Sequence, residues 1–337
     1  MEINEPDVES EDTATALFEV HRSASANDRP ELPGPCPYAF RVDLRQPRPG
    51  QRTVRRVAAI DGEIVGSVSV WLPTIDNLHL AGLDIVVAPA HRGRGIGRRL
   101  AEAGIDLARA EGRRTITAAA LATVPGGVER SSAGRQLLES LGFTAALTEL
   151  WRIADITALD PAEEARLYAG ALEKAADYEL RSWAGRVPDD LLGDVAALDS
   201  SFLDEAPMGE LDVQAEKIDA QRVRDNDDAM LARGLSTWGV VAKHRETGQG
   251  VAITMVGKAK EPPEHAGQWI TLVHPDHRGH RLGLLTKLEN HRQVRRDAPA
   301  VRWLSTANAD VNAYMISVNE RLGYRLLDGT TEYQLKV

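Results

Sequence analysis

The stretch LDIVVAPAHRGRGIGRR, Leu83–Arg99, joins a short apolar run, a glycine-rich loop and the start of a helical pattern. Leu83 to Val87 predicts a buried strand, which Pro89 ends because proline has no N–H to give to a neighbouring strand. Apolar residues then recur at helical spacing from Ile96 onward. Glycines let the backbone approach a ligand closely, and the first amides of a helix have no helical partners. The stretch therefore predicts an anion site suited to a diphosphate.

A second copy of this pattern occurs in the other half of the chain. The segment WITLVHPDHRGHR, Trp269–Arg281, aligns Arg278 with Arg92, and a helical pattern follows it too. Further along each half, a helical run ends in Leu-Gly-Phe or Leu-Gly-Tyr. Because the two marks recur in the same order, at a separation typical of whole domains, they indicate a duplicated domain.

An Arg-x-x-Gly-x-Gly loop after a strand, with a later helix ending in Gly-Phe or Gly-Tyr, resembles the GCN5-related N-acetyltransferases. The resemblance covers nearly all of both halves, so the chain is identified as a tandem member. The segment HRGHRLG also resembles the C-terminal half of actinobacterial two-domain members related to mycothiol synthase. The first loop fits the family pattern in full, whereas the second has Arg281 where the middle glycine is expected.

The resemblance implies that acetyl-CoA, or another acyl-CoA, is the co-substrate. In the family the loop amides hold the pyrophosphate, and the preceding strand parts from its neighbour to bind the pantetheine arm. An asparagine at the start of the last helix often touches pantetheine. These implications give the following cofactor-binding residues: Val86, Val87, Arg92, Gly93, Arg94, Gly95, Ile96, Gly97, Arg98, Leu272, Val273, Arg278, Gly279, His280, Arg281, Leu282, Gly283 and Asn312.

The sequence of each half predicts an α+β fold in αβα layers, with a mixed, mostly antiparallel sheet and helices on both faces. The expected division is an N-terminal domain at residues 1–154, a linker helix at 155–177 and a C-terminal domain at 178–337. A helix is predicted from Ser10 to Arg22, and another from Asp212 to Leu231. Six prolines between Arg29 and Gly50 predict irregular structure. The last strand, Thr331 to Val337, is expected to close the second domain.

The family's usual catalytic groups are missing from both halves. The tyrosine that serves as the acid in many members is replaced by Leu138 and Asn319, and the glutamate on the cofactor strand by Ala81 and Gly267. A base would therefore have to be water or a residue of the acceptor loops.

The second half carries more polar residues around its predicted centre, so we expect the chemistry there. The catalytic candidates are Asn308, Tyr314 and Asn319, and the first half would bind CoA or be structural. Capping of a turn and a helix is an equally good interpretation of Asn308 and Asn312.

Three other polar features have competing interpretations. Asp84 lies inside the first cofactor strand, where a buried carboxylate would either pair with an arginine or take part in chemistry. The histidines at 274, 277 and 280 have no metal-ligand spacing, so no metal is expected. The run from Asp204 to Asp228 is acidic, which suggests a cationic acceptor or, more simply, a solvated helix face.

Composition limits the class of protein. The chain has 337 residues and a net charge of −10, which argues against a nucleic-acid partner, and one cysteine, which excludes a disulfide framework. No apolar stretch predicts a membrane span or a signal peptide, so a cytoplasmic location is expected. The glycine spacing disfavours a nicotinamide dinucleotide site.

The predicted function is acyl-CoA-dependent N-acyl transfer, most simply of acetyl, to the amine of a small molecule. Two alternatives stay open: a non-catalytic acyl-CoA sensor or scaffold, and a different acyl-CoA reaction in natural-product biosynthesis. The oligomeric state is left open.

Overall fold

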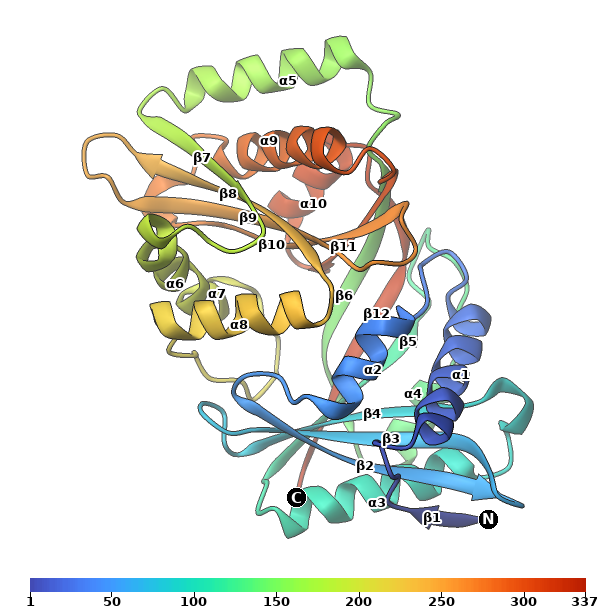
Figure 1. Ribbon diagram of the computed structural model, residues 1–337. Coiled ribbons are helices and arrows are strands. Elements are labelled where there is room, and N and C mark those ends of the chain that lie inside the picture. Colours follow the sequence, from blue (N-terminus) through green and yellow to red (C-terminus); the bar gives the residue numbers. More distant parts are fainter. The chain divides into compact units, whose positions relative to one another are not determined.

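The computed structural model describes residues 1–337, apart from the side chain of Asp204. The chain forms two compact units (Figure 1), which are described one at a time. The first unit contains Met1–Leu150, Met208–Gln214 and Asp328–Val337, and the second contains Trp151–Pro207 and Ala215–Leu327.

The first unit is built on a mixed sheet with the strand order β1-β2-β3-β4-β5-β12-β6. The β4–β5 pair is parallel, whereas β1–β2, β2–β3, β3–β4 and β5–β12 are antiparallel. The elements are β1 (Glu2–Asn4), α1 (Glu11–Asp28), α2 (Pro37–Arg45), β2 (Gln51–Ile60), β3 (Glu63–Pro73), β4 (Leu80–Val87), α3 (Ile96–Ala110), β5 (Thr115–Ala122), α4 (Ala133–Ser140), β6 (Thr144–Asp155) and β12 (Arg325–Lys336).

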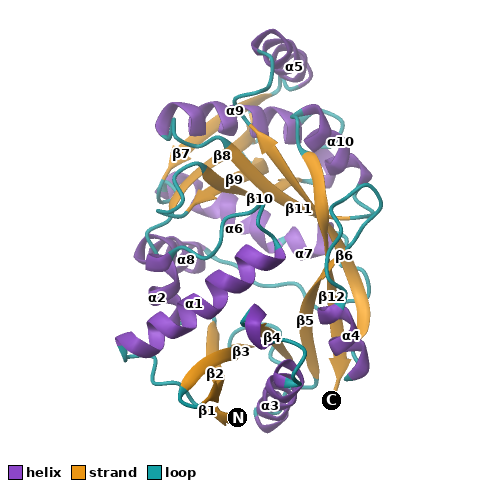
Figure 2. Ribbon diagram, turned by 90° about the vertical axis from the view of Figure 1, so that its right-hand side faces the viewer, coloured by secondary structure: helices purple, strands orange, loops and turns teal.

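Helices cover both faces of this sheet (Figures 1 and 2). On one face, α3 and α4 bury an apolar core that includes Leu100, Ile105 and Leu138. On the other face, α1 and α2 pack through a smaller cluster that includes Leu17 and Leu44. The smaller cluster leaves part of the sheet on the α1 side to polar residues, and the smaller of the two cavities described below lies there.

Two predictions about individual elements are wrong. The proline-rich segment contains the helix α2, because Pro37 occupies a first-turn position, where proline's missing N–H and fixed φ are tolerated. The last strand does not close the second domain: from Gly329 to Lys336 it pairs with β5 of the first unit. The other predicted domain boundaries stay a prediction.

The second unit repeats the arrangement, with the strand order β11-β10-β9-β8-β7 and the residues Trp151–Asp155 of β6 beside β11. Helices α5, α9 and α10 share one core with the sheet, and α6 and α8 share the core on its other face. The elements are α5 (Pro161–Lys174), β7 (Tyr178–Ala184), α6 (Leu192–Ser200), α7 (Phe202–Glu205), α8 (Ala220–Ala232), β8 (Ser236–His244), β9 (Gly250–Lys258), β10 (His265–Val273), α9 (Leu282–Asp297), β11 (Trp303–Ala309) and α10 (Ala313–Arg321).

The helix predicted from Asp212 begins only at Ala220, where Asp219 accepts a hydrogen bond from the amide of Arg222 and caps α8. The segment Met208–Gln214 instead belongs to the first unit, where the amide of Glu210 donates to the carbonyl of Ala146. No helix among the described residues combines the length and the apolar composition needed to span a bilayer.

Candidate active site

The parallel strands β4 and β5 part within the first unit. Their pairing joins Leu80–Leu83 to Thr115–Ala118 and goes no further in the described residues. Beyond that point, the residues Val86–Val87 and Ala119–Leu121 line a cavity of about 1020 Å³. Peptide groups that have lost their sheet partner are free to bind a ligand's amides and carbonyls. The parted strands thus form a groove that leads to the glycine loop.

The glycine loop presents the start of α3 to this cavity. Gly93 and Gly95 have φ values of +74° and +79°, a left-handed conformation that favours glycine. Gly95 is the N-cap of α3 and brings no side-chain cap, so the first amides of the helix are not satisfied by a capping side chain. The helix dipole adds positive potential at the same place. This arrangement suits a phosphate or diphosphate group.

The structure brings together nearly all of the cofactor-binding residues predicted in the first half. Arg94 is exposed outside the cavity lining. The predicted residues that line the cavity are Val86, Val87, Arg92, Gly93, Gly95, Ile96, Gly97 and Arg98.

The side chain of Arg92 is held by the protein itself. Its Nη1 lies 2.6 Å from Oδ1 of Asp28, and its Nε donates to the carbonyl of Val87 at 2.9 Å. Arg92 therefore fixes the end of α1 to the end of β4, and the backbone amides of the loop are left as the anion-binding groups.

A buried carboxylate organises the rim of the same cavity. The side chain of Asp328, on β12, is fully buried and accepts hydrogen bonds from Arg29 at 2.7 Å and from Arg130 at 2.6 Å. Arg130 also lies 2.7 Å from Glu31. Since Arg29 and Arg130 both line the cavity, this network fixes the segment after α1 beside it.

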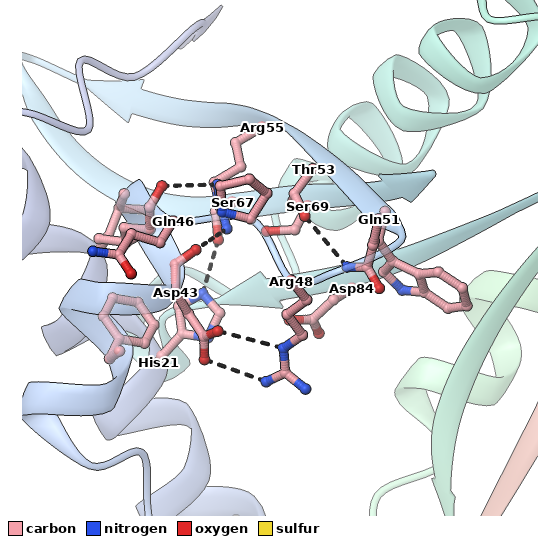
Figure 3. Close-up of a pocket in the computed structure, with 15 residues that line it drawn as sticks. His21, Asp43, Gln46, Arg48, Gln51, Thr53, Arg55, Ser67, Ser69 and Asp84 are labelled. Carbon is pink, nitrogen blue, oxygen red and sulfur yellow. Dashed lines mark hydrogen bonds and ion pairs between the residues drawn. The ribbon is translucent and has the colours of Figure 1, made fainter. Parts of the chain in front are cut away.

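A second cavity of about 470 Å³ lies on the α1 side of the sheet (Figure 3). Side chains alternate between the faces of a strand, so Thr53 and Arg55 of β2 and Ser67, Ser69 and Trp71 of β3 point to this side. Helices α1 and α2 form the opposite wall. His21 and Asp84 line both cavities, so the two spaces meet at these side chains.

His21 projects from α1 at this junction. Its Nε2 lies 3.1 Å from Oγ of Ser67, and its ring packs against Phe40. Burial lowers the pKa of His21, the positive charge of Arg55 lowers it further, and the carboxylate of Asp84 raises it in part. Because the net shift is downward, the ring is neutral near pH 7 and is able to accept a proton.

Asp84 is exposed rather than buried, and it does not form the arginine pair that was one of its two interpretations. It is exposed to the two cavities, and no hydrogen bond or ion pair joins it to another of the described residues. It therefore presents a free negative charge close to His21.

In the second unit a side chain bridges the corresponding strands at the point where their pairing ends. β10 and β11 pair over His265–Gly267 and Trp303–Ser305, and just beyond, Oγ1 of Thr306 donates to the carbonyl of Gln268 at 3.2 Å. Arg281, the N-cap of α9, has φ +57°, so it adopts the left-handed conformation that Gly95 adopts in the first loop.

The second loop is also engaged by α5. Nη1 of Arg281 lies 3.4 Å from the carbonyl of Gly170, and Nδ1 of His280 lies 3.2 Å from the carbonyl of Lys174. Arg278 pairs with Glu205. Of the other predicted residues, Leu282 and Gly283 are buried, Gly279 is exposed, Leu272 packs in the core beside α6, and Val273 packs against the core beside α9.

The predicted catalytic residues of the second half are only partly brought together. Asn319 is fully buried, donates to Oδ1 of Asn308 and accepts a hydrogen bond from Nζ of Lys287, both at 2.6 Å. Burial lowers the pKa of Lys287 to about 7. Tyr314 is 57% exposed and lies outside this chain of hydrogen bonds, and Oδ1 of Asn312 caps α10 by accepting from the amide of Met315.

The remaining polar features of the second half are structural. His277 bonds to the hydroxyl of Tyr178, and no three described His, Cys, Asp or Glu side chains form a group that could hold a metal ion. Most of the acidic run forms ion pairs or helix caps: Glu216 pairs with Arg222, Asp228 pairs with Arg186, and Asp219 caps α8. The side chain of Asp204 lies outside the described residues.

Sequence reasoning missed His21 and Arg55 as site residues. His21 shares a helical face with Leu17, which indicates that it faces inward, but nothing local shows that it meets Asp84, more than sixty residues away. Side chains of β2 alternate between the two faces of the sheet, and this alternation gives the face on which Arg55 lies. The sequence does not show that a cavity rather than an apolar core lies on that face.

Comparisons with known proteins agree with this geometry. Residues 16–142 match the model of the acetyltransferase (GNAT) family. Over the whole chain, the structure is similar to a tandem GNAT protein from the clavulanic acid biosynthesis pathway, solved without acetyl-CoA, with 26% identity, a TM-score of 0.83, and coverage of 99% of this chain and 98% of that one.

Two more distant structures share the fold. A GCN5-related N-acetyltransferase from Sphaerobacter thermophilus is 15% identical, with a TM-score of 0.64 and coverage of 99% and 95% of the two chains. A putative acetyltransferase from Pyrococcus horikoshii is 14% identical, with a TM-score of 0.58 and coverage of 100% and 89%. No curated protein matches the sequence.

Proposed function

Because residues 16–142 belong to the GNAT acetyltransferase family and the whole chain has a tandem GNAT fold, we propose that this protein is an acyl-CoA-dependent N-acyltransferase. The acyl group is most simply acetyl, and the acceptor is the amine of a small molecule. The observation that carries the proposal is the groove between β4 and β5, which runs from the glycine loop to His21 and Asp84.

The residues of the first unit fit an acyl-CoA. The amides at the start of α3 would hold the pyrophosphate, and the free backbone of Val86 and Val87 would bind the pantetheine arm. The cavity of about 1020 Å³ provides room for such an extended ligand. The thioester would then lie near the junction of the two cavities, which His21 and Asp84 line.

We place the chemistry in the first half, which reverses the expectation from the sequence. In the second half the bond from Thr306 to Gln268 bridges the strands where they would part, and α5 engages the loop. The buried chain of Lys287, Asn319 and Asn308 is accounted for by its own hydrogen bonds. Binding of CoA by the second half stays a prediction.

His21 and Asp84 supply what acyl transfer requires from the protein. Asp84 would hold the acceptor's ammonium group at the junction, and neutral His21 would take its proton, directly or through water. The amine nitrogen forms a bond to the acyl carbon as the carbon–sulfur bond breaks. The thiolate leaves with a proton from His21 or solvent, since Leu138 stands where the family often has a tyrosine.

Calorimetric titration of the intact protein with acetyl-CoA tests the proposal. Gly95→Val puts a β-branched side chain in the left-handed region and is expected to weaken binding strongly. Gly112→Val, at φ +70° in the exposed turn after α3 and outside the cavity lining, is the matched control and should leave binding unchanged. Absence of acetyl-CoA binding, or equal binding by wild type and Gly95→Val, would refute the proposed site.

One observation favours the alternative of a sensor without turnover. Leu138 lines the cavity and cannot protonate a thiolate. A thiol-release assay with acetyl-CoA and a panel of amines separates the two functions, because a sensor binds acetyl-CoA and releases no free thiol.

A further inference from the structure

The smaller cavity carries two opposite charges that do not meet. Across the antiparallel strands, Arg55 pairs in register with Ser69, and Ser69 pairs with Asp84, so the three residues form one row across the sheet. All three line the cavity. Because neighbouring strands lie about 4.8 Å apart, the ends of this row are separated by roughly 10 Å of backbone.

The guanidinium of Arg55 is held away from Asp84. Its Nη1 donates to the carbonyl of Leu44 at 3.2 Å and its Nη2 donates to the carbonyl of Asp43 at 2.9 Å. No ion pair joins Arg55 to a carboxylate among the described residues, so it keeps its positive charge and further N–H groups for a ligand. Asp84 and Arg55 still influence each other electrostatically.

The middle of the row is small and polar. Ser69 separates the two charged side chains and fills little of the space between them (Figure 3). The indole of Trp71 lies across Gly82, where any Cβ would collide with the ring, and extends the lining of the cavity. The carboxylate of Asp43 pairs with Arg48 at 3.3 Å and also acts electrostatically on Arg55.

We infer that the acceptor is a small zwitterion of the amino acid class, which carries its amine and a carboxylate on one compact skeleton. The carboxylate binds the guanidinium of Arg55. The amine lies beside Asp84 and His21, at the end of the cavity that opens toward the acyl-CoA groove. This assignment rests on the proposed acyltransferase function and names the substrate class for it.

The row accounts for both ends of such a ligand. An amine without an anion would leave the remaining N–H groups of Arg55 without a ligand acceptor, and an anion without an amine would leave Asp84 without a ligand cation. A ligand with both charges satisfies the two groups at once, and a carboxylate accepts two parallel hydrogen bonds from a guanidinium.

The experiment is a thiol-release assay on the intact protein with acetyl-CoA. The acceptors are the free α-amino acids and short ω-amino acids, each compared with its own carboxamide, which keeps the amine and lacks the negative charge. We expect at least one free amino acid to react with a kcat/KM about tenfold or more above that of its amide.

Three variants locate the recognition. Arg55→Met should raise the KM for the amino acid about ten- to hundredfold and change the KM for the amide little. Arg56, on the same strand, pairs with Glu5, and Arg56→Met is the control, which should leave both KM values unchanged. Because Arg55 also holds the end of α2, Ser69→Leu provides an independent test: it fills the gap between the charges without removing either one.

The outcomes separate this inference from the proposed function. Equal kcat/KM for amino acids and their amides, or acetyl-CoA binding with no amino acid acetylated, overturns the substrate class and leaves the acyl-CoA site standing. Absence of acetyl-CoA binding overturns the function itself. If the Ser69→Leu variant acetylates the amino acid as fast as the wild type does, the inference is also overturned. If this variant loses amino acid acetylation but binds acetyl-CoA normally, the inference is supported.

Discussion

Replacing Asp328 with asparagine should destabilise the first unit by about 3–5 kcal/mol. The side chain of Asp328 is fully buried, and its two oxygens receive hydrogen bonds from Arg29 and Arg130, whose side chains are only 15% and 5% exposed. Removing the charge of Asp328 leaves two buried guanidinium groups with less negative charge around them in a medium of low polarity, which usually costs this much. Asparagine keeps the size of the side chain, so the change isolates the charge.

The assay is urea denaturation monitored by circular dichroism. The midpoints of wild type and variant are compared when the two have the same dependence of unfolding free energy on urea concentration. Trp71 is the first unit's one tryptophan, so its fluorescence in a variant lacking the other five tryptophans would report on this unit alone. The control is Asp106→Asn, because that carboxylate is 77% exposed and its pairing with Arg109 contributes at most about 0.5 kcal/mol. A loss at position 328 no larger than the loss at position 106 would refute the reasoning.

Three further predictions follow from the buried groups and the second loop. His21→Gln should lower kcat/KM by about 10²–10⁴-fold. It should also abolish the fall of kcat/KM at acid pH, which in the wild type lies below pH 6.5 because burial lowers the pKa of His21. A variant that keeps this fall at acid pH would exclude His21 as the base. Burial lowers the pKa of Lys287 from 10.5 to about 7, so between these pH values the unfolded chain binds a proton that the folded chain lacks, and the free energy of unfolding increases as the pH rises. The difference in this free energy between wild type and Lys287→Met should therefore increase from pH 7 to pH 10.5. A difference that does not change with pH would contradict the lowered pKa. Arg281→Gly should stabilise the protein by up to about 1 kcal/mol, since Arg281 occupies the left-handed region. The variant should still bind one acetyl-CoA per chain in calorimetric titration. A second bound equivalent would show that the altered loop accepts the ligand.

The local parts of the fold were predictable because their signals are local. The apolar run before Pro89, the glycines at 93, 95 and 97 and the helical spacing after them predict β4, the loop and α3, and all three are present. The α+β architecture with helices on both faces is confirmed in each unit. The sequence does not predict α2, because prolines usually break helices, although Pro37 is compatible with a first turn.

The site was harder to predict because it depends on contacts between distant residues. Arg92 is a predicted cofactor-binding residue and lines the cavity, but its guanidinium pairs with Asp28, a residue that the sequence offers no reason to choose. The row of Arg55, Ser69 and Asp84 depends on the register of two hairpins. Shifting either register by one residue would turn these side chains to the opposite face, and the sequence does not fix registers to that accuracy.

The pairing of β12 with β5 affects how this chain is made. On the ribosome, β5 emerges long before the residues after Asp328 that cover its edge, a delay on the order of ten to forty seconds at ordinary rates of translation. Throughout that interval β5, of sequence TITAAALA, has one edge without its partner strand, and this edge is open to pairing with other chains. A chain that lacks residues 328–337 would keep this exposed edge permanently, so we expect the codons for these residues to decide whether the first half matures or aggregates.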